Sequence, residues 1–243
     1  GCNKSSPLYG SGNYWIVRVD AEGNKLWDAS FGGGSEYLLE LQQASDGGFI
    51  LGGQTGAGVG GNKTSPNFGT TGTTAYDFWI VKTDAAGQKR WEREFGGVGT
   101  DYFHTFSQTA DGGLLLGGSS RCNISGNKTS TNYSGNTIIY YDYWVVRTDS
   151  EGNWLWDQTY GGTHSDRLAD LCLMPDQGFI ALGQSYSAPS GNKTSTNFAG
   201  PDYWIVRADA SGNKNGEQIL GGDGEESFEG AFTSIKGSLG RIL

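Results

Sequence analysis

A short repeated segment is the feature that most constrains the fold of this chain. It occurs four times, always with a tryptophan at its third position, at a period of about 60 to 65 residues. The four copies are Asn13–Asp20, Asp77–Asp84, Asp142–Asp149 and Asp202–Asp209. A steady period in this range predicts a tandem array of one supersecondary unit, rather than a fold with a single conventional active site.

Each copy contains four short strand signals separated by glycine-rich turns. In one such set the strands are expected at Tyr102–Thr109, Leu114–Gly118, Phe78–Thr83 and Lys89–Phe95. The composition joins 42 Gly with 8 Trp, 12 Tyr and 11 Phe, which favours tight turns around a packed core over a disordered chain. Four antiparallel strands per repeat are typical of a β-propeller blade. A β-helix would need a much shorter repeat, and a sandwich would not repeat this closely.

Three strings carry a resemblance to a known group of proteins. Asp202–Arg207 (DYWIVR), Gly23–Trp27 (GNKLW) and Asp46–Gly53 (DGGFILGG) resemble the repeats of secreted bacterial β-propeller proteins over essentially the whole chain. That family is defined mostly by its repeat, so the resemblance implies a fold and a secreted or cell-surface location more than a function. It also implies that the innermost strand of each blade follows the Gly-Gly turn. The implied inner strands are Tyr37–Ala44, Tyr102–Thr109, Arg167–Met174 and Ser227–Ser234.

The phase of the repeats predicts how such a propeller could close. We expect one all-β propeller domain over 1–243, with repeat units at approximately 1–36, 37–101, 102–166 and 167–226 and closing strands at 227–243. The N-terminal half-blade lacks inner strands, and the C-terminal segment would supply them. Pairing the two would close a ring of four blades without an open edge. The alternative is that the chain is a fragment of a larger propeller.

The long loops are expected on one face and the tight hairpins on the other, because strands alternate in direction. Long loops in a compact domain are usually functional or disordered. These loops share the string Gly-Asn-Lys-Thr-Ser, and acidic residues that follow the Gly-Gly turns lie on the same face. The candidate ligand-binding residues are Asn62, Lys63, Thr64, Asn127, Lys128, Thr129, Asn192, Lys193, Thr194, Glu36, Asp101, Asp166 and Glu226.

Two interpretations of these residues are open. In the functional one, Asn, Lys, Thr and Asp bind sugar hydroxyls in repeated polar pockets, and nearby aromatic rings stack on the sugar. In the structural one, the loop side chains bond to their own backbone, and the acids cap the Gly-Gly turn or pair with the loop lysines. Repetition does not favour function, since every copy must also fold.

Charge and cysteine content exclude several classes of protein. The formal net charge of −9 disfavours a nucleic-acid partner. The sequence contains no apolar run of about 18 residues, so we expect no membrane span. Cys2, Cys122 and Cys172 are too widely spaced for a disulfide framework or a metal cluster. We expect no cofactor and no metal. One hypothesis for Cys2, which follows Gly1, is that it is a lipid-modified N-terminus, but the repeat register explains these residues as well.

No set of catalytic residues stands out. His104 and His164 belong to different blades, and no nucleophile, zinc or phosphate-binding motif occurs. We therefore expect a non-catalytic interaction or scaffold module that binds a protein or glycan partner through the long-loop face. The alternative is a lectin-like propeller with repeated sites, and a purely structural spacer is a rival. A third hypothesis, a glycan-cleaving enzyme, would use Glu36, Asp101, Asp166 and Glu226, with Glu40, Asp170 and Glu229 deeper in the channel.

Most tryptophans fit a structural role. Trp15, Trp79, Trp144 and Trp204 recur at blade period and are expected to interlock neighbouring blades. Trp154 stands where Lys25 and Lys89 stand in other copies, so we expect it to be an exposed contact.

Overall fold

The computed structural model describes residues 3–69, 75–135 and 139–224, and within them the chain is all-β, as predicted. No helix occurs among these residues, and so none is long and apolar enough to cross a membrane. The strands are β1 (Gly12–Val19), β2 (Lys25–Gly34), β3 (Glu36–Gln43), β4 (Phe49–Thr55), β5 (Asp77–Thr83), β6 (Lys89–Phe95), β7 (Asp101–Gln108), β8 (Leu114–Ser120), β9 (Asp142–Thr148), β10 (Trp154–Tyr160), β11 (Asp166–Leu173), β12 (Phe179–Ser185), β13 (Asp202–Ala208) and β14 (Lys214–Leu220).

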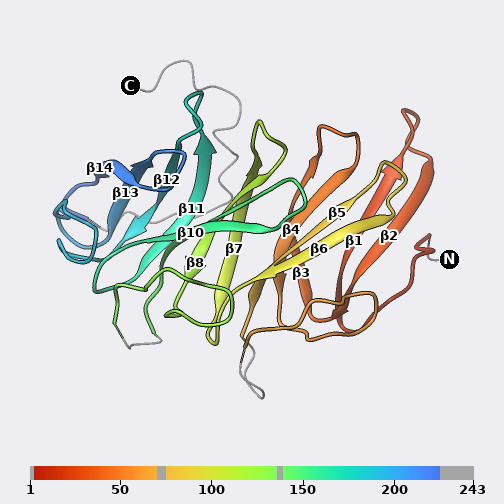
Figure 1. The fold of residues 1–243 in the computed structure, drawn as a ribbon, viewed down its shortest axis with the longest axis horizontal. Coiled ribbons are helices and arrows are strands. Elements are labelled where there is room, and N and C mark those ends of the chain that lie inside the picture. Colours follow the sequence, from red (N-terminus) through yellow and green to blue (C-terminus); the bar gives the residue numbers. More distant parts are fainter. Residues whose placement is uncertain (1–2, 70–74, 136–138, 225–243) are drawn as a thin grey trace.

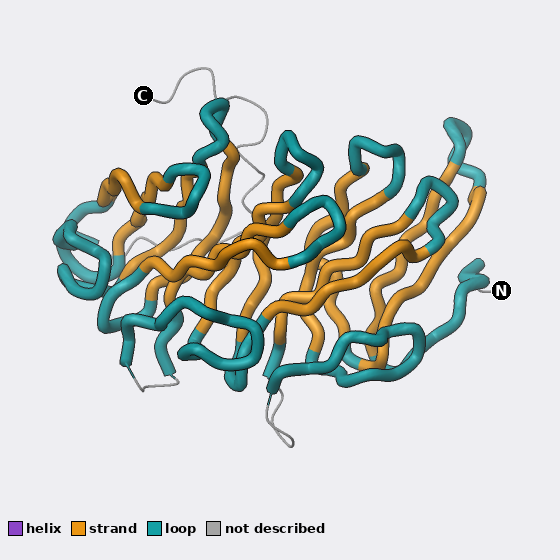
Figure 2. The backbone as a smooth tube through the Cα atoms, viewed as in Figure 1, coloured by secondary structure: helices purple, strands orange, loops and turns teal. Residues whose placement is uncertain are grey.

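The strands form antiparallel sheets that lie side by side (Figures 1 and 2). The first sheet holds β1 and β2, the second β3 to β6, the third β7 to β10 and the fourth β11 to β14. The predicted four-stranded units and the N-terminal half-unit are thus confirmed. The strand at Lys89–Phe95 has the predicted bounds, and the predicted Phe78–Thr83 strand begins one residue earlier, at Asp77.

The third strands of the second and third sheets, β5 and β9, have two buried faces because sheets pack on both sides of them. In β5, Phe78 and Ile80 point towards the third sheet, whereas Trp79 and Val81 point towards the first. All four side chains are buried, which explains why this segment is apolar at every position rather than at alternate ones.

Aromatic pairs join each sheet to the next. They confirm that Trp79, Trp144 and Trp204 interlock the units, whereas the expectation is wrong for Trp15, which is 42% exposed. Truncating a buried aromatic ring to alanine costs about 3–5 kcal/mol. The pairs are Tyr14–Trp79, Phe78–Trp144 and Tyr143–Trp204, with ring centroids 4.7, 4.8 and 5.1 Å apart.

In the first three sheets a second tryptophan packs against a turn of the next sheet, whereas Gly216 stands at this position in the fourth. Gly87 has φ +77°, and a Cβ at this position would lie 2.8 Å from the ring of Trp27 in the preceding sheet. Glycine is therefore required both for the left-handed backbone and for the close approach. The same contact recurs between Trp91 and Gly152 and between Trp156 and Gly212.

Ring closure stays a prediction. The first strands of neighbouring sheets, β3, β7 and β11, lie next to each other, as inner strands would. The sheets of β1–β2 and β13–β14, however, lie at opposite ends of the row (Figure 1). The fourth implied inner strand, Ser227–Ser234, and the closing segment 227–243 lie outside the described residues, as do Cys2 and Glu226.

Candidate functional site

The repeated Gly-Asn-Lys-Thr-Ser motif forms a tight turn within each long loop. The loops span 56–76, 121–141 and 186–201, and residues 70–74 and 136–138 within the first two lie outside the described residues. Each motif glycine, Gly61, Gly126 or Gly191, has φ near +60°. Backbone bridges such as Gly60 to Lys63 then hold the turn closed.

The motif asparagine ties each loop to the preceding sheet. Asn127 accepts a hydrogen bond from the Gly96 amide at 2.9 Å and donates one to the Glu94 carbonyl at 2.8 Å. These two bonds satisfy backbone groups at the end of β6 that would otherwise lack partners. Asn62 and Asn192 repeat both contacts with the first and third sheets. The amide therefore acts as a latch between sheets.

The motif lysine is buried against the tryptophan of its own unit. Lys128 lies with its Nζ 5.1 Å from the centre of the Trp144 ring and donates to the Thr159 hydroxyl at 2.6 Å. Burial lowers the pKa of the Lys128 ammonium to about 8. Lys63 and Lys193 are equally buried, over Trp79 and Trp204, and Lys63 pairs with Glu94.

The motif threonine is exposed, but its polar groups are engaged. Its backbone amide and its hydroxyl both donate to a carboxylate on the outermost strand of the same unit. Thr64 bonds to Glu92, Thr129 to Asp157 and Thr194 to Glu217.

The acidic residues after the Gly-Gly turns are buried caps. Glu36 accepts from the amides of Gly33 and Gly34, Asp101 from Gly97, and Asp166 from Gly162. Burial raises the pKa of Asp166 to about 6.

These contacts match the structural interpretation, in which the loop side chains bond within the chain and the acids cap the Gly-Gly turns. The structure brings the described candidates together at the base of the loops, where the lysines and acids are buried and the asparagine and threonine side chains are bonded within the chain. A glycan substrate would not reach Glu36, Asp101 or Asp166, which are at most 3% exposed. Glu226 lies outside the described residues.

A different set of side chains lies on the same face, half exposed at one end, Tyr37, and buried at the other, Tyr141. Tyr37, Tyr76, Tyr102 and Tyr141 form a continuous series of ring contacts, which we call the tyrosine row. Their successive ring centroids are 5.7, 6.2 and 5.5 Å apart, and the last pair is stacked. Tyr37 and Tyr102 lie at the beginnings of β3 and β7, whereas Tyr76 and Tyr141 directly precede β5 and β9, so the row crosses from the second sheet to the third.

Two arginines flank the end of the tyrosine row. Arg121 and Arg167 lie over the Tyr141 ring, with guanidinium carbons 5.6 and 5.5 Å from its centre. Neither forms an ion pair with a carboxylate of the described residues. His104 is on the same strand as Tyr102, and its side chain is exposed. The two arginines give this area its positive charge.

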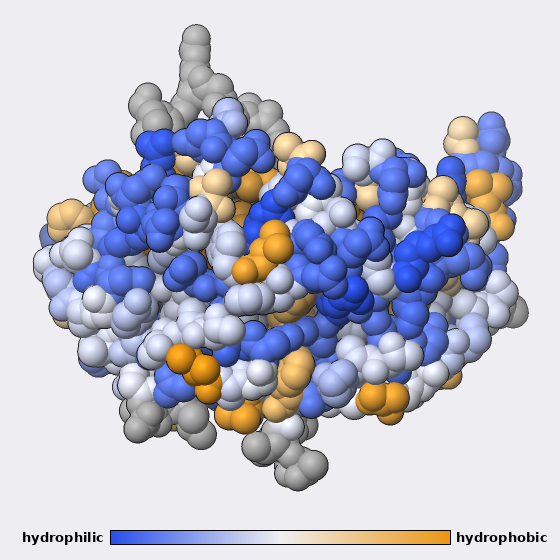
Figure 3. Space-filling model, in the orientation of Figure 1, coloured by the Kyte–Doolittle hydropathy of each residue, from blue (hydrophilic) through white to orange (hydrophobic). Residues whose placement is uncertain are grey.

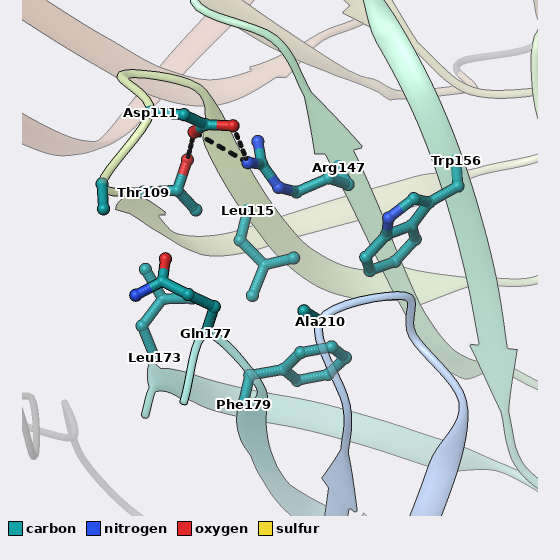
Figure 4. A pocket seen from close by; sticks show the side chains of 10 residues that line it. Thr109, Asp111, Leu115, Arg147, Trp156, Leu173, Gln177, Phe179 and Ala210 are labelled. Atoms are coloured by element: carbon teal, nitrogen blue, oxygen red, sulfur yellow. Dashed lines mark hydrogen bonds and ion pairs between the residues drawn. The ribbon is translucent and has the colours of Figure 1, made fainter. Parts of the chain in front are cut away.

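A pocket of about 370 Å³ opens on the opposite, tight-turn face between the third and fourth sheets (Figure 4). Its floor is apolar and its rim carries the Asp111–Arg147 ion pair at 2.7 Å together with Thr109 and Gln177. Gln177 has φ +65°, where the equivalent turns have Gly47 and Gly112. This departure from the repeat places a strained side chain at the rim. The floor consists of Leu115, Trp156, Leu173, Phe179 and Ala210.

No metal centre is indicated in the described part of the chain. Its His, Cys, Asp and Glu side chains include no group of three or more that could hold an ion. Cys122 is buried with its Sγ 3.3 Å from the Asp101 carboxylate, and Cys172 is partly buried.

Sequence reasoning missed the tyrosine row and the pocket. A signal for the row was present, because Tyr37 and Tyr102 stand one repeat apart, as do Tyr76 and Tyr141. Trp154, in contrast, is exposed as expected, with 42% of its surface accessible to solvent.

Comparison with known proteins shows a similarity but does not show a family. No protein-family model matches the chain. The chain is similar to the regulatory protein FlaEY of Caulobacter vibrioides, at 23% identity over 183 residues, which cover 75% of this chain. The aligned part spans 19% of the length of that protein.

Proposed function

We propose that this chain is a non-catalytic interaction module, secreted or on the cell surface, that binds its partner through the tyrosine row. The observation that carries the proposal is the unbroken contact between four tyrosines from two sheets, with Tyr37 half exposed at one end and two arginines at the other. The partner is a protein or a glycan.

The chemistry of the row suits recognition. Tyrosine offers a rigid apolar face and a hydroxyl, and arginine offers planar donors, so both residue types are enriched at binding hot spots. Arg121 and Arg167 add positive charge to a chain whose net charge is −9. A carboxylate or sulfate on the partner would therefore be attracted to this place rather than to the rest of the surface.

The surface and the comparison bear on this proposal in different ways. The face seen in Figure 3 is largely hydrophilic with isolated apolar spots, which is ordinary for a protein surface. The similar Caulobacter protein is named a regulatory protein, and regulation through contacts requires no catalytic centre. We propose, in addition, that the sheets form an arc of a propeller, with β3, β7 and β11 lining its centre.

The test is binding of the labelled protein to an array of neutral and uronate-bearing oligosaccharides and to an array of tiled peptides. Tyr102→Ala and Arg167→Glu should each weaken binding at least tenfold. Arg90→Glu is the matched control, because Arg90 is an exposed arginine on the outer strand β6. Binding that survives both changes, or binding that all three variants lose equally, would reject the tyrosine row as the site.

The pocket in Figure 4 favours a second candidate, saccharide binding on the tight-turn face. Its volume is within the usual range for small ligands, and Trp156 and Phe179 provide aromatic surface below a polar rim. Gln177→Gly would restore the repeat and remove the rim amide. Loss of sugar binding in calorimetry with this variant, but not with Tyr102→Ala, would support the pocket over the row.

A further inference from the structure

The first residues of β5 and β9, Asp77 and Asp142, each have a carboxyl oxygen without a hydrogen-bond partner in the described part of the chain. Their Oδ2 atoms accept from loop amides, at 2.8 Å from Phe68 and at 2.6 Å from Tyr133, and the Oδ1 atoms are left over. Both side chains are completely buried. A buried carboxylate oxygen without a donor is costly, so these two atoms need an explanation.

Each of these aspartates lies beside a second buried carboxyl group, one of the acids that cap the Gly-Gly turns. A Cβ at Gly96 would lie 2.0 Å from Asp77 Oδ1 and 2.9 Å from Asp101 Oδ2, so both carboxyl groups lie against the same glycine. Burial and then the Asp101 charge raise the pKa of Asp77 to about 9. Burial and then the Asp166 charge raise the pKa of Asp142 to about 8. Two neighbouring buried carboxyl groups strongly disfavour a second charge.

The first sheet has an amide where these sheets have a carboxyl group. Asn13 stands at the position of Asp77, beside Glu36 in place of Asp101. The Asn13 Oδ1 atom accepts from the Tyr9 amide at 2.8 Å, so its Nδ2 atom takes the place of the aspartate Oδ1. An amide nitrogen carries hydrogens, and an aspartate matches it only as the protonated acid.

The acid that caps the turn is the member of each pair suited to keep its charge. Asp166 Oδ2 accepts from the Gly162 amide and from the Ser187 hydroxyl, both at 2.8 Å. Asp101 Oδ2 accepts from the Gly97 amide at 2.9 Å. Donors of this kind stabilise the ionised form of a carboxyl group. The proton of each pair therefore belongs on the aspartate of the third strand.

Other charged and titratable groups face the two pairs from the elements packed around them. Around Asp142 and Asp166 they are Lys128, Lys193 and the Tyr143 phenol, and around Asp77 and Asp101 they are Glu94 with its ion-pair partner Lys63, Cys122 and Lys128. The lysines favour ionised carboxyl groups, whereas Glu94 adds a like charge beside Asp77. Burial and the neighbouring acid outweigh the lysines, because the pKa of both third-strand aspartates stays raised.

The two pairs adjoin the tyrosine row. Asp101 directly precedes Tyr102, and its amide donates to the Tyr76 carbonyl at 2.6 Å. The Asp166 amide donates to the Tyr141 carbonyl at 2.5 Å in the same way. Each pair thus lies where the backbone before a third strand is bonded to the first strand of the next sheet, and the row is built on these bonded segments.

We propose that Asp77 and Asp142 are neutral carboxylic acids in the folded protein, and that loss of their protons opens the backbone bonds that hold the tyrosine row together. Ionisation places two negative charges in one buried site, and their repulsion acts across the bonds from Asp101 to Tyr76 and from Asp166 to Tyr141. The row is assembled up to neutral pH and loosened at alkaline pH. The proposed function enters only in what this device controls, because its protons and its bonds are measured without a partner.

Carbon-13 NMR of the full chain labelled at aspartate tests the protons directly. The carboxyl carbons of two aspartates should titrate above pH 7, and both signals should be absent from the double variant Asp77→Asn, Asp142→Asn. Asparagine already occupies this position in the first sheet, so the variant should fold, which circular dichroism checks. The label does not report Glu94 or the lysines. A spectrum with every aspartate ionised at pH 6 would overturn the proposal, and so would one in which the two signals titrate only after EDTA is added, since a cation would then occupy the pairs.

Hydrogen exchange at the Asp101 and Asp166 amides tests the release. After correction for the intrinsic pH dependence of exchange, protection of both amides should fall at least tenfold from pH 6 to pH 9 in the wild type and less than twofold in the double variant. Glu151→Gln is the matched control, because it removes an exposed carboxylate on the turn between β9 and β10, and it should behave as the wild type. Lys128 is present in all three proteins, so its titration cannot produce a difference between them.

Equal falls of protection in the three proteins would refute the release of the row. The proposed function fails separately. If protection falls as expected but Tyr102→Ala leaves partner binding unchanged, the proton device stands and the tyrosine row is not the binding site. If Tyr102→Ala abolishes binding while protection and binding are the same at pH 6 and pH 9, the row is the site and the device is refuted.

Discussion

Replacing Asn127 with alanine should destabilise the protein without touching an exposed ligand site. The variant loses the hydrogen bonds to Gly96 and Glu94, at 2.9 and 2.8 Å, and leaves one amide and one carbonyl without their partner. A net hydrogen bond contributes about 1 kcal/mol, and an orphaned buried group costs about 1–3 kcal/mol, so we expect a loss of about 2–4 kcal/mol. For a chain of this size that lowers Tm by roughly 5–15 °C.

The assay is thermal unfolding by circular dichroism, with Asn123→Ala as control. Asn123 lies in the same loop and donates to the Gly135 carbonyl at 3.1 Å on the surface, so its loss should lower Tm by no more than about 3 °C. Equal small shifts for both variants, together with a loss of partner binding only in Asn127→Ala, would refute the latch and restore the functional interpretation of the motif.

Two further predictions follow from backbone strain and buried charge. In urea titration, Gly87→Ala should lower the free energy of unfolding by at least about 1 kcal/mol more than Gly23→Ala does. Both glycines have positive φ, but only Gly87 contacts a tryptophan ring. Equal losses would show that the contact with the ring does not constrain this position. Burial and the neighbouring Asp166 raise the pKa of Asp142 to about 8, so the folded state keeps a proton that the unfolded state releases near pH 4. The free energy of unfolding should therefore fall as the pH rises from 4 to 8, by up to about 1.4 kcal/mol per pH unit for this proton. Asp142→Asn should reduce this pH dependence, and Tm at pH 5 and pH 8 measures it for both proteins. An equal change of Tm in the wild type and the variant would contradict a raised pKa for Asp142.

The strands were predictable because their signals are local. Tryptophan-centred apolar segments and Asp-Gly-Gly turns place β5, β6 and the hairpins to within a residue or two. The role of the loops was harder to predict, because it depends on partners far away in the sequence. Lys128 is buried by Trp144 and Thr159, and neither the loop nor its composition indicates that. The sequence left a functional and a structural interpretation of these loops open, and the hydrogen bonds of the structure match the structural one.

The tyrosine row illustrates a different limit. Its members come from the beginnings of β3 and β7 and from the residues just before β5 and β9, which strand alternation and the stacking of sheets bring together. A pattern search along one repeat sees isolated tyrosines. Likewise, the exposure of Trp15 becomes visible only when sheets on both sides of a third strand are compared.

Native-state hydrogen exchange at two amides tests the central claim that the repeated loops join the sheets. Gly96 and Gly161 donate their amide hydrogens to Asn127 and Asn192 of the following unit, and no strand pairing protects them. If the loops are latches, both amides should exchange at least about a hundredfold more slowly than in an unfolded peptide. Exchange within about tenfold of the unfolded rate would show that the loops are free, and would contradict this account.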